Sequence, residues 1–175
     1  MSIVVNRAPV LTLWAAVVAE RLGYGPDTAL TLGRFVAGFS ARAKAKRIGL
    51  IDERLEVDER ARRAEELKPK RETIRLLGRD IPVLPADDGT PHAVEDGKPA
   101  SARGVHGYVS RAFGDQLPEV RAAMKELAAS LPPEELNRVG FDLYIKFRPE
   151  VPDGTPGWGA RGSLDLDRVR RAASG

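Results

Sequence analysis

Cysteine is absent from this chain of 175 residues. Its absence excludes disulfides, thiol catalysis, iron–sulfur clusters and cysteine zinc sites, and it is typical of proteins in a reducing compartment. Apolar residues make up 42% of the sequence and charged residues 30%, which is typical of folded proteins rather than disordered ones. A chain of this length can bury roughly 70% of its unfolded surface without disulfides or metals. We therefore expect a cytoplasmic protein of one domain, with or without an appendage.

Histidine is nearly as scarce, since His92 and His106 are the only two. Neither is accompanied by a second histidine or an acid at a spacing typical of metal ligands, so we expect no metal. Ser110 lacks the glycines of a nucleophile elbow, and no set of nucleophile, base and oxyanion donors can be assembled. These absences favour a protein without catalysis or a cofactor. The alternative is an enzyme with a cleft around His106, Tyr108 and nearby acids.

One glycine motif lacks the context that its chemistry requires. Residues 157–162 read G-x-G-x-x-G, but a dinucleotide site needs a strand before the glycines, a helix after them and an acid about 20 residues downstream. Here a proline-rich loop precedes the motif and only 13 residues follow it. The stretch is therefore predicted to be a loop, in which Trp158 either covers the core or anchors a protein partner.

Long apolar runs are missing as well. The apolar run at residues 8–19 is too short for a membrane-spanning helix, which needs about 20 residues. Glu20 and Arg21 close the run, and no Ala-x-Ala cleavage site follows it. The run is therefore predicted to be a buried helix rather than a signal peptide or a membrane span.

The clearest pattern in the sequence is a pair of helices at the N-terminal end. Pro9 and Gly23 predict a first helix over residues 9–22, because proline suits a first helical turn and glycine suits the residue after a helix end. A second helix begins near Pro26 and runs to Arg47. Its core stripe has helical spacing, and its small residues would let another helix approach closely. The stripe is Leu32, Phe35, Val36 and Phe39, and the small residues are Gly33, Ala37, Gly38 and Ala41.

The remaining sequence predicts a charged segment and a β-hairpin. Residues 51–71 carry dense charges of both signs and predict either a linker or an exposed helix between residues 1–50 and residues 72–175. Residues 72–84 predict two strands with a turn at Gly78-Arg79-Asp80. Pro82 favours an edge position for the second strand, because proline cannot donate a hydrogen bond to a neighbouring strand.

Further helices are predicted in the C-terminal half. One is capped by Ser101 and ends at Gly114, one begins near Leu117, one begins at Pro132-Pro133, and a short final helix is capped by Ser163 or Asp165. The predicted fold class is therefore mainly α with a small β-hairpin (α+β). Its order is a helix-turn-helix-like pair, a hairpin and a helical C-terminal part, with the C-terminal part packed against residues 1–50 as one domain.

The N-terminal pair has the spacing of a DNA-binding helix-turn-helix. Ala19 lies four residues before Gly23, and residues 1–50 hold seven basic and two acidic side chains. On the outward face of the second helix, Thr31 and Arg34 are the useful groove residues. A basic run at its end would contact phosphates without reading the base sequence. We therefore predict largely sequence-nonspecific binding of DNA or RNA; the residues of the run are Arg42, Lys44, Lys46 and Arg47.

Two other interpretations of the same residues remain open. Any αα-hairpin with a short glycine turn has similar spacing, and the helix dipole alone favours cations near a helix C-terminus. The chain could also be a protein-interaction or homo-oligomerisation module, in which the small-residue helix and the Trp158 loop meet a partner.

Three segments resemble a family of small bacterial proteins that have no assigned function. These segments are RAPVLTLWAAVVAERLG, ALTLGRFVAGFSA and GWGARGSLDLDRVRR. The resemblance covers most of the chain outside residues 52–70. It implies a bacterial origin and brings no site residues with it.

Overall fold

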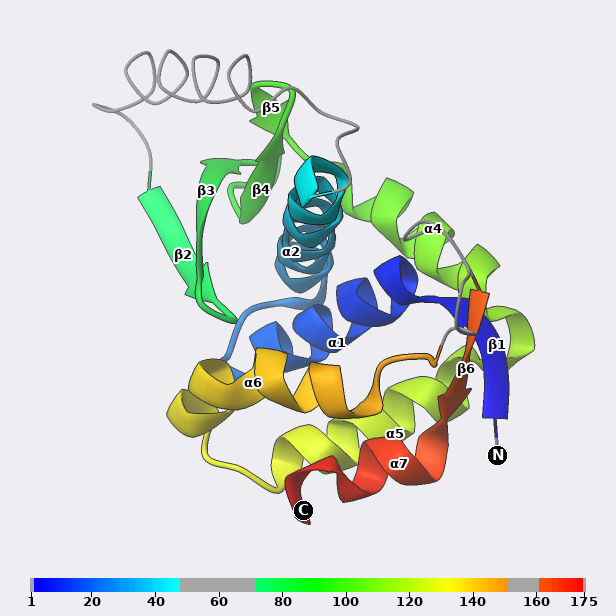
Figure 1. Cartoon of the computed structure of the whole chain (residues 1–175). Coiled ribbons are helices and arrows are strands. Elements are labelled where there is room, and N and C mark those ends of the chain that lie inside the picture. Colours follow the sequence, from blue (N-terminus) through cyan, green and yellow to red (C-terminus); the bar gives the residue numbers. More distant parts are fainter. Residues whose placement is uncertain (1, 48–71, 151–160, 175) are drawn as a thin grey trace.

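The computed structural model describes residues 2–47, 72–150 and 161–174 (Figure 1). Helices dominate, and the strands form two small antiparallel sheets, so the predicted mainly α fold with a minor β component is confirmed. The elements are β1 (Ser2–Asn6), α1 (Arg7–Arg21), α2 (Pro26–Arg47), β2 (Glu72–Leu76), β3 (Arg79–Pro85), β4 (Pro91–Glu95), β5 (Lys98–Pro99), α4 (Ala102–Phe113), α5 (Leu117–Ala129), α6 (Pro133–Phe147), β6 (Arg161–Asp165) and α7 (Leu166–Arg171), with one-turn 3₁₀ helices at Gly114–Gln116 and Ala172–Ser174.

Helix α1 runs through the centre of the molecule (Figure 1). Its residues 9–19 are all buried, because apolar or small side chains cover every side of the helix and α2, α4, α5 and α6 pack around it. Trp14 is fully buried, and its indole Nε1 donates a hydrogen bond of 2.9 Å to the carbonyl oxygen of Gly140 on α6. The ring of Phe147 meets Trp14 edge-on, with ring centroids 5.3 Å apart. The predicted buried helix is confirmed.

Helices α1 and α2 cross at Gly33. A Cβ atom on this glycine would lie 2.2 Å from the carbonyl oxygen of Thr12 and 3.1 Å from the backbone nitrogen of Ala16. The predicted close approach of another helix is therefore confirmed here, and the other helix is α1. Gly38, for which the sequence predicts the same role, is exposed, and a Cβ atom added to it would meet nothing within 4 Å among the described residues. Gly23 makes the predicted turn between the helices, with a φ of 108°.

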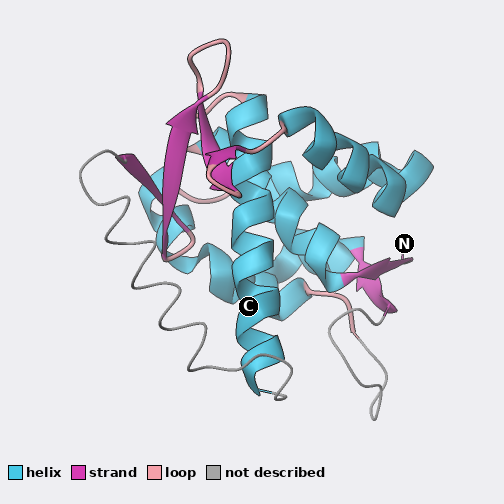
Figure 2. Ribbon diagram, turned by 90° about the horizontal axis from the view of Figure 1, so that it is seen from above, coloured by secondary structure: helices cyan, strands magenta, loops and turns pink. Residues whose placement is uncertain are grey.

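The predicted hairpin is part of a four-stranded sheet with strand order β2-β3-β4-β5 (Figure 2). The predicted edge position of the second strand is therefore wrong, because β3 lies between β2 and β4. Pro82 is accommodated because it pairs only with Thr73 of β2, whereas the pairing of β3 with β4 begins at Val83. The missing N–H group thus interrupts no ladder between β3 and β4.

The turn of this hairpin lies at Leu77-Gly78 rather than at Gly78-Arg79-Asp80. Both residues have positive φ, 51° and 80°, which is typical of a tight two-residue hairpin turn. A leucine rarely adopts this conformation, but Leu77 is buried and packs against Gly140. Its backbone N–H also donates to the side-chain oxygen of Asn137 at 2.7 Å. Tertiary contacts with α6 therefore hold a turn that local sequence does not indicate.

A second sheet, which the sequence does not predict, joins the two ends of the described chain. Strand β1 pairs antiparallel with β6, in a register that places Val4 opposite Ser163. The expectation of a loop at residues 161–162 is therefore wrong. Ser163, one of two candidate helix caps, lies in β6, and Asp165 caps α7 by accepting a hydrogen bond from the backbone N–H of Asp167 at 3.0 Å.

The other predicted helix boundaries in the C-terminal half are confirmed. The side chain of Ser101 caps α4 by accepting a hydrogen bond from the backbone N–H of Gly104, and Gly114 follows the helix with a φ of 57°. Helix α5 begins at Leu117 and α6 begins at Pro133, where proline suits the first turn.

Candidate ligand groove between β1 and α4

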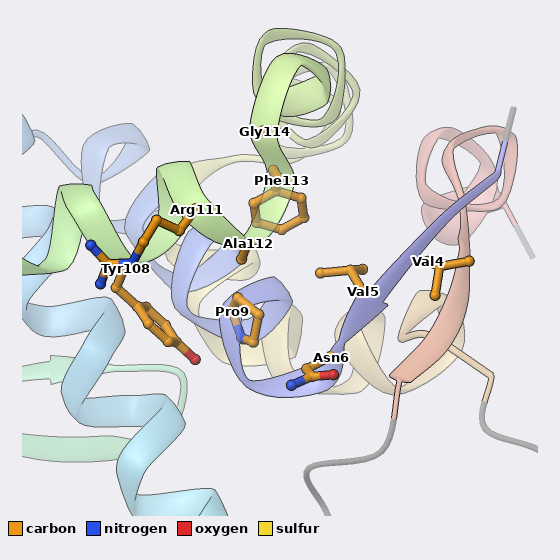
Figure 3. A pocket seen from close by; sticks show the side chains of 9 residues that line it. All are labelled: Val4, Val5, Asn6, Pro9, Tyr108, Arg111, Ala112, Phe113 and Gly114. Carbon is orange, nitrogen blue, oxygen red and sulfur yellow. The ribbon is translucent and has the colours of Figure 1, made fainter.

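A groove of about 480 Å³ separates β1 from the C-terminal half of α4 (Figure 3). Its volume lies in the range of small-ligand sites, roughly 300–1,000 Å³. In Figure 3, β1 stands between β6 on one side and the groove on the other, and α4 forms the opposite wall. The lining residues are Val4, Val5, Asn6, Pro9, Tyr108, Arg111, Ala112, Phe113 and Gly114.

The backbone of β1 turns its unpaired edge toward this groove. Ser163 of β6 exchanges both of its backbone hydrogen bonds, each 3.0 Å long, with Glu150 rather than with β1. In an antiparallel ladder hydrogen-bonded and non-hydrogen-bonded pairs alternate, so Val4, which lies opposite Ser163, directs its N–H and C=O away from β6. Ile3 and Val5 direct theirs toward β6 by the same rule. The N–H and C=O of Val4 have no backbone partner among the described residues.

The side chains of β1 alternate between the core and solvent. Ile3 and Val5 are buried, and Figure 3 shows Val5 directed toward Phe113 of α4. Val4 is 66% exposed, and with Ile145 it is one of the two large apolar side chains that are exposed in the described part of the chain. The outer face of β1 is therefore exposed and carries no charge at Val4.

Asn6 lines the groove and has a buried, unpaired side-chain oxygen. It occupies the N-cap position of α1, yet its side chain makes no capping hydrogen bond. Its Oδ1 atom is buried and has no hydrogen-bond partner among the described residues. A buried polar atom without a partner costs roughly 1–3 kcal/mol. Figure 3 shows the amide nitrogen of Asn6 on the side of Tyr108 and the Oδ1 atom on the side of β6, so the unpaired acceptor is directed away from the opposite wall of the groove.

Tyr108 contributes a donor from the opposite wall. Val105, Val109 and Phe113 form the buried stripe of α4, and Tyr108 lies beside this stripe, half-buried. Burial raises the pKa of the Tyr108 hydroxyl, and the charge of Arg34 offsets part of this rise. The hydroxyl is therefore protonated at neutral pH and can donate a hydrogen bond.

Two arginines make this wall positive. The guanidinium Cζ of Arg34, from α2, lies 4.7 Å from the ring centroid of Tyr108 in a cation–π contact. Arg111 is exposed, and its guanidinium lies over Gly107, where a Cβ atom would be 3.3 Å from Nη1. Neither arginine forms an ion pair within the described chain, and no Asp or Glu of that part lines the groove. The groove thus suits a ligand that carries a negative charge.

Thr31 and Arg34, both predicted to contact nucleic acid, differ in their surroundings. The prediction that Thr31 faces outward is wrong: Thr31 is 1% exposed, and its hydroxyl donates to the carbonyl of Thr28 and accepts from the N–H of Ala93 in β4. The four-stranded sheet packs on this face of α2 and covers it. Arg34 is exposed as predicted, but it stacks on Tyr108.

The remaining residues predicted to bind a partner lie at the edge of the described structure or beyond it. The basic residues Arg42, Lys44, Lys46 and Arg47 lie on the last turns of α2, where only the backbone is described. Trp158 and the charged segment 51–71 lie outside the described residues.

The two histidines are not part of the groove. His106 is exposed on α4 and does not line the groove. Of the two residues expected to share a cleft, His106 and Tyr108, only Tyr108 lines the groove. His92 is buried in β4, where Nδ1 lies 2.8 Å from the carbonyl oxygen of Ala100 and Nε2 lies 3.3 Å from the hydroxyl of Thr90. These contacts give His92 a structural role in the sheet.

Metal-binding clusters and membrane-spanning helices are both missing from the described residues. No three His, Asp or Glu side chains among them gather as metal ligands. None of the described helices combines the length and the apolar character needed to cross a bilayer.

The sequence alone does not single out Val4, Asn6 or Arg111 as site residues. The available signal for Asn6 is its position before an apolar helix, where asparagine is a frequent N-cap. Residues 2–6 contain no turn or charge pattern that predicts pairing with a strand far away in sequence, so the groove itself could not be foreseen.

Comparison of the chain with known protein families, with curated proteins and with solved structures finds no match. The resemblance to a bacterial family therefore gains no support from these comparisons.

Proposed function

We propose that this protein is a recognition module that binds a carboxylate-bearing segment of a partner protein in the groove between β1 and α4. The observation that supports this proposal is the combination of two arginines without acidic partners in the described chain and an open groove beside them. Among the alternatives predicted from the sequence, it corresponds to the protein-interaction module, with β1 and α4 as the interacting elements.

The side chains of the groove suit binding better than catalysis. Arg111 offers a planar guanidinium that can hold a carboxylate through two parallel hydrogen bonds. The Tyr108 hydroxyl can add a third donor, because a tyrosine hydroxyl is protonated at neutral pH. The described lining residues include no Ser, Thr, Lys, His, Asp or Glu that could act as a nucleophile or a neutral-pH base.

Titration with a simple carboxylate tests the proposal. We expect N-acetylglycine to shift the backbone NMR signals of Tyr108, Arg111 and Asn6, with a dissociation constant of roughly millimolar size. Arg111→Gln should weaken this binding at least about tenfold, because a charge-assisted hydrogen bond contributes roughly 1.5–3 kcal/mol.

Matched controls separate a specific site from a general charge effect. Arg103→Gln removes an exposed cation from the same helix and should leave the binding unchanged. N-acetylglycinamide, which lacks the negative charge, should not bind. Equal shifts with the amide, or equal binding by the Arg111→Gln variant, would contradict the proposal.

Nucleic-acid binding is a second candidate, supported by the course of α2. The helix continues to Arg47, so Arg42, Lys44, Lys46 and Arg47 lie on its last turns. Contact with phosphates there would be independent of base sequence, and Thr31 would take no part.

A salt titration with a DNA duplex tests this second candidate. Affinity should be roughly micromolar at low salt, should fall steeply as salt rises, and should be lost when the four basic residues are replaced by glutamine. The Arg111→Gln variant is the control and should bind the duplex normally. No binding at low salt would exclude this candidate.

A further inference from the structure

We infer that the partner segment binds as an additional β-strand along the free edge of β1, a proposal that rests on the proposed function. The segment would lie in the groove in extended conformation, exchange hydrogen bonds with the N–H and C=O of Val4, and place a carboxylate beside Arg111. The sheet of β1 and β6 would thereby gain a third strand supplied by the partner.

The edge of β1 has the features of a strand that accepts another strand. Exposed edges in other proteins are usually blocked by lysine, proline, a bulge or a covering element. The sequence of β1, SIVVN, has no charged residue and no proline, and Val4 is 66% exposed. Helix α4 stands beyond this edge, but the groove keeps it from covering the backbone of Val4 (Figure 3).

The hydrogen-bonding groups of the groove are complementary to a peptide rather than to a simple anion. Arg111, the hydroxyl of Tyr108 and the N–H of Val4 are donors, and they match a carboxylate and a carbonyl oxygen. The C=O of Val4 is an acceptor, and it requires an N–H group. An isolated carboxylate cannot donate to this acceptor at neutral pH, whereas an extended peptide presents N–H and C=O groups in alternation.

The cationic groups lie on the α4 side of the groove. Tyr108 and Arg111 are three residues apart on α4 and therefore lie on neighbouring positions of one helix face. In Figure 3 the ring of Tyr108 extends toward the end of the groove that holds Asn6 and Pro9, whereas Phe113 and Gly114 lie at the other end. Arg111 lines the groove, but its guanidinium lies over Gly107 and is directed away from β1, so an acidic side chain of the strand would reach it across Tyr108 (Figure 3). This complementarity selects an acidic extended segment as the occupant.

Hydrogen exchange at single backbone amides distinguishes strand addition from other binding. The probes are a set of pentapeptides of alternating threonine and valine, each with glutamate at a different position. At saturation with the best-binding peptide, the amide of Val4 should exchange about tenfold more slowly or better, because it becomes hydrogen-bonded. The amides of Ile3 and Val5 should change little, because they already face β6.

One modified peptide and one substitution in the protein test whether backbone hydrogen bonds of Val4 contribute to peptide binding. N-methylation of the peptide nitrogen that faces Val4 should weaken binding at least about tenfold, since it removes one backbone donor. Val4→Pro removes the N–H of the free edge, a position where proline is tolerated, and should abolish peptide binding while N-acetylglycine still binds. If Val4→Pro does not fold, the N-methylated peptide makes the same test on the unchanged protein.

The outcomes separate the two proposals. Peptide binding without protection of Val4, or equal binding of the N-methylated peptide, would overturn strand addition and leave the carboxylate site standing. Binding of N-acetylglycine but of none of the pentapeptides would do the same. Failure of both the peptides and N-acetylglycine would overturn the proposed function together with strand addition.

Discussion

The core around α1 and the groove beside β1 differ in whether their polar groups have hydrogen-bond or ion-pair partners. In the core, the indole of Trp14 is paired with the carbonyl of Gly140, and the hydroxyl of Thr12 is paired with the carbonyl of Ala8. In the groove, the Oδ1 of Asn6 is buried without a partner in the described chain, and Arg111 forms no ion pair there.

This difference separates groups that stabilise the fold from groups that are available to a ligand. Proteins satisfy nearly all buried polar atoms, so an unsatisfied one calls for an explanation. The other such atom in the described residues is Nε of Arg121, whose guanidinium is already paired with Glu20 at 3.0 Å. The Oδ1 of Asn6 has no comparable pairing, and Asn6 lines the groove. Substitutions in the two regions test this contrast, and Gly33 is the position where the largest effect is expected.

The core should tolerate no side chain at Gly33. Gly33→Ala places a methyl group against the backbone of Thr12, which cannot move without separating α1 from α2. We expect a loss of roughly 3 kcal/mol or more in the free energy of unfolding, measured by urea denaturation. Gly38→Ala is the matched control on the exposed side of the same helix, and it should stabilise the protein by roughly 0.5–1 kcal/mol. Similar effects of the two substitutions would contradict the described helix crossing.

The hydrogen bond of Trp14 should be needed for stability. Trp14→Phe keeps an aromatic ring but removes the indole donor of the hydrogen bond to the carbonyl of Gly140, and a cavity forms beside the smaller ring. We expect a loss of roughly 2–4 kcal/mol in the free energy of unfolding, again measured in urea. Phe147→Leu, which keeps the hydrogen bond, serves as a comparison for the loss of packing alone. A loss no larger than that of a typical surface substitution, about 0.5 kcal/mol, would argue against the bond.

Tyr144 should make stability fall at alkaline pH. Burial raises the pKa of Tyr144 to about 12, whereas the unfolded chain has the ordinary value near 10. As pH rises, the hydroxyl therefore ionises in the unfolded state before it ionises in the folded state. The stabilisation is complete below pH ~10 and is lost progressively as pH rises toward ~12. The loss assigned to Tyr144 is roughly 2–3 kcal/mol.

Comparison with Tyr144→Phe isolates this contribution. The variant should lose less stability between neutral pH and pH ~11 than the unchanged chain in urea denaturation, because it has no hydroxyl to ionise at this position. Parallel pH profiles of the two proteins would show that Tyr144 is not the responsible group.

The smallest effect on folding is expected in the groove. Asn6→Ala removes a buried acceptor that has no partner in the described chain and makes no capping bond, so the free energy of unfolding should change by less than about 0.5 kcal/mol or increase. A large destabilisation of the fold would show that Asn6 stabilises the folded state. The groove would then not differ from the core in this respect.

Local sequence determined the helices and their ends. Ser101, Gly114 and Asp165 act within one turn of their own positions, and the apolar spacing of residues 9–22 reports burial directly. These features could be predicted because caps and helical periodicity depend on neighbours three or four residues away.

The tertiary structure alone decided the turn at Leu77, the burial of Thr31 and the groove. Leu77 adopts a positive φ because α6 receives its side chain, and Thr31 is buried because β4 packs on α2. The groove exists because β1 pairs with β6, so residues 2–6 meet residues 161–165 from the other end of the sequence. Such pairing depends on contacts between distant segments, and no local pattern encodes which edge of β1 remains free.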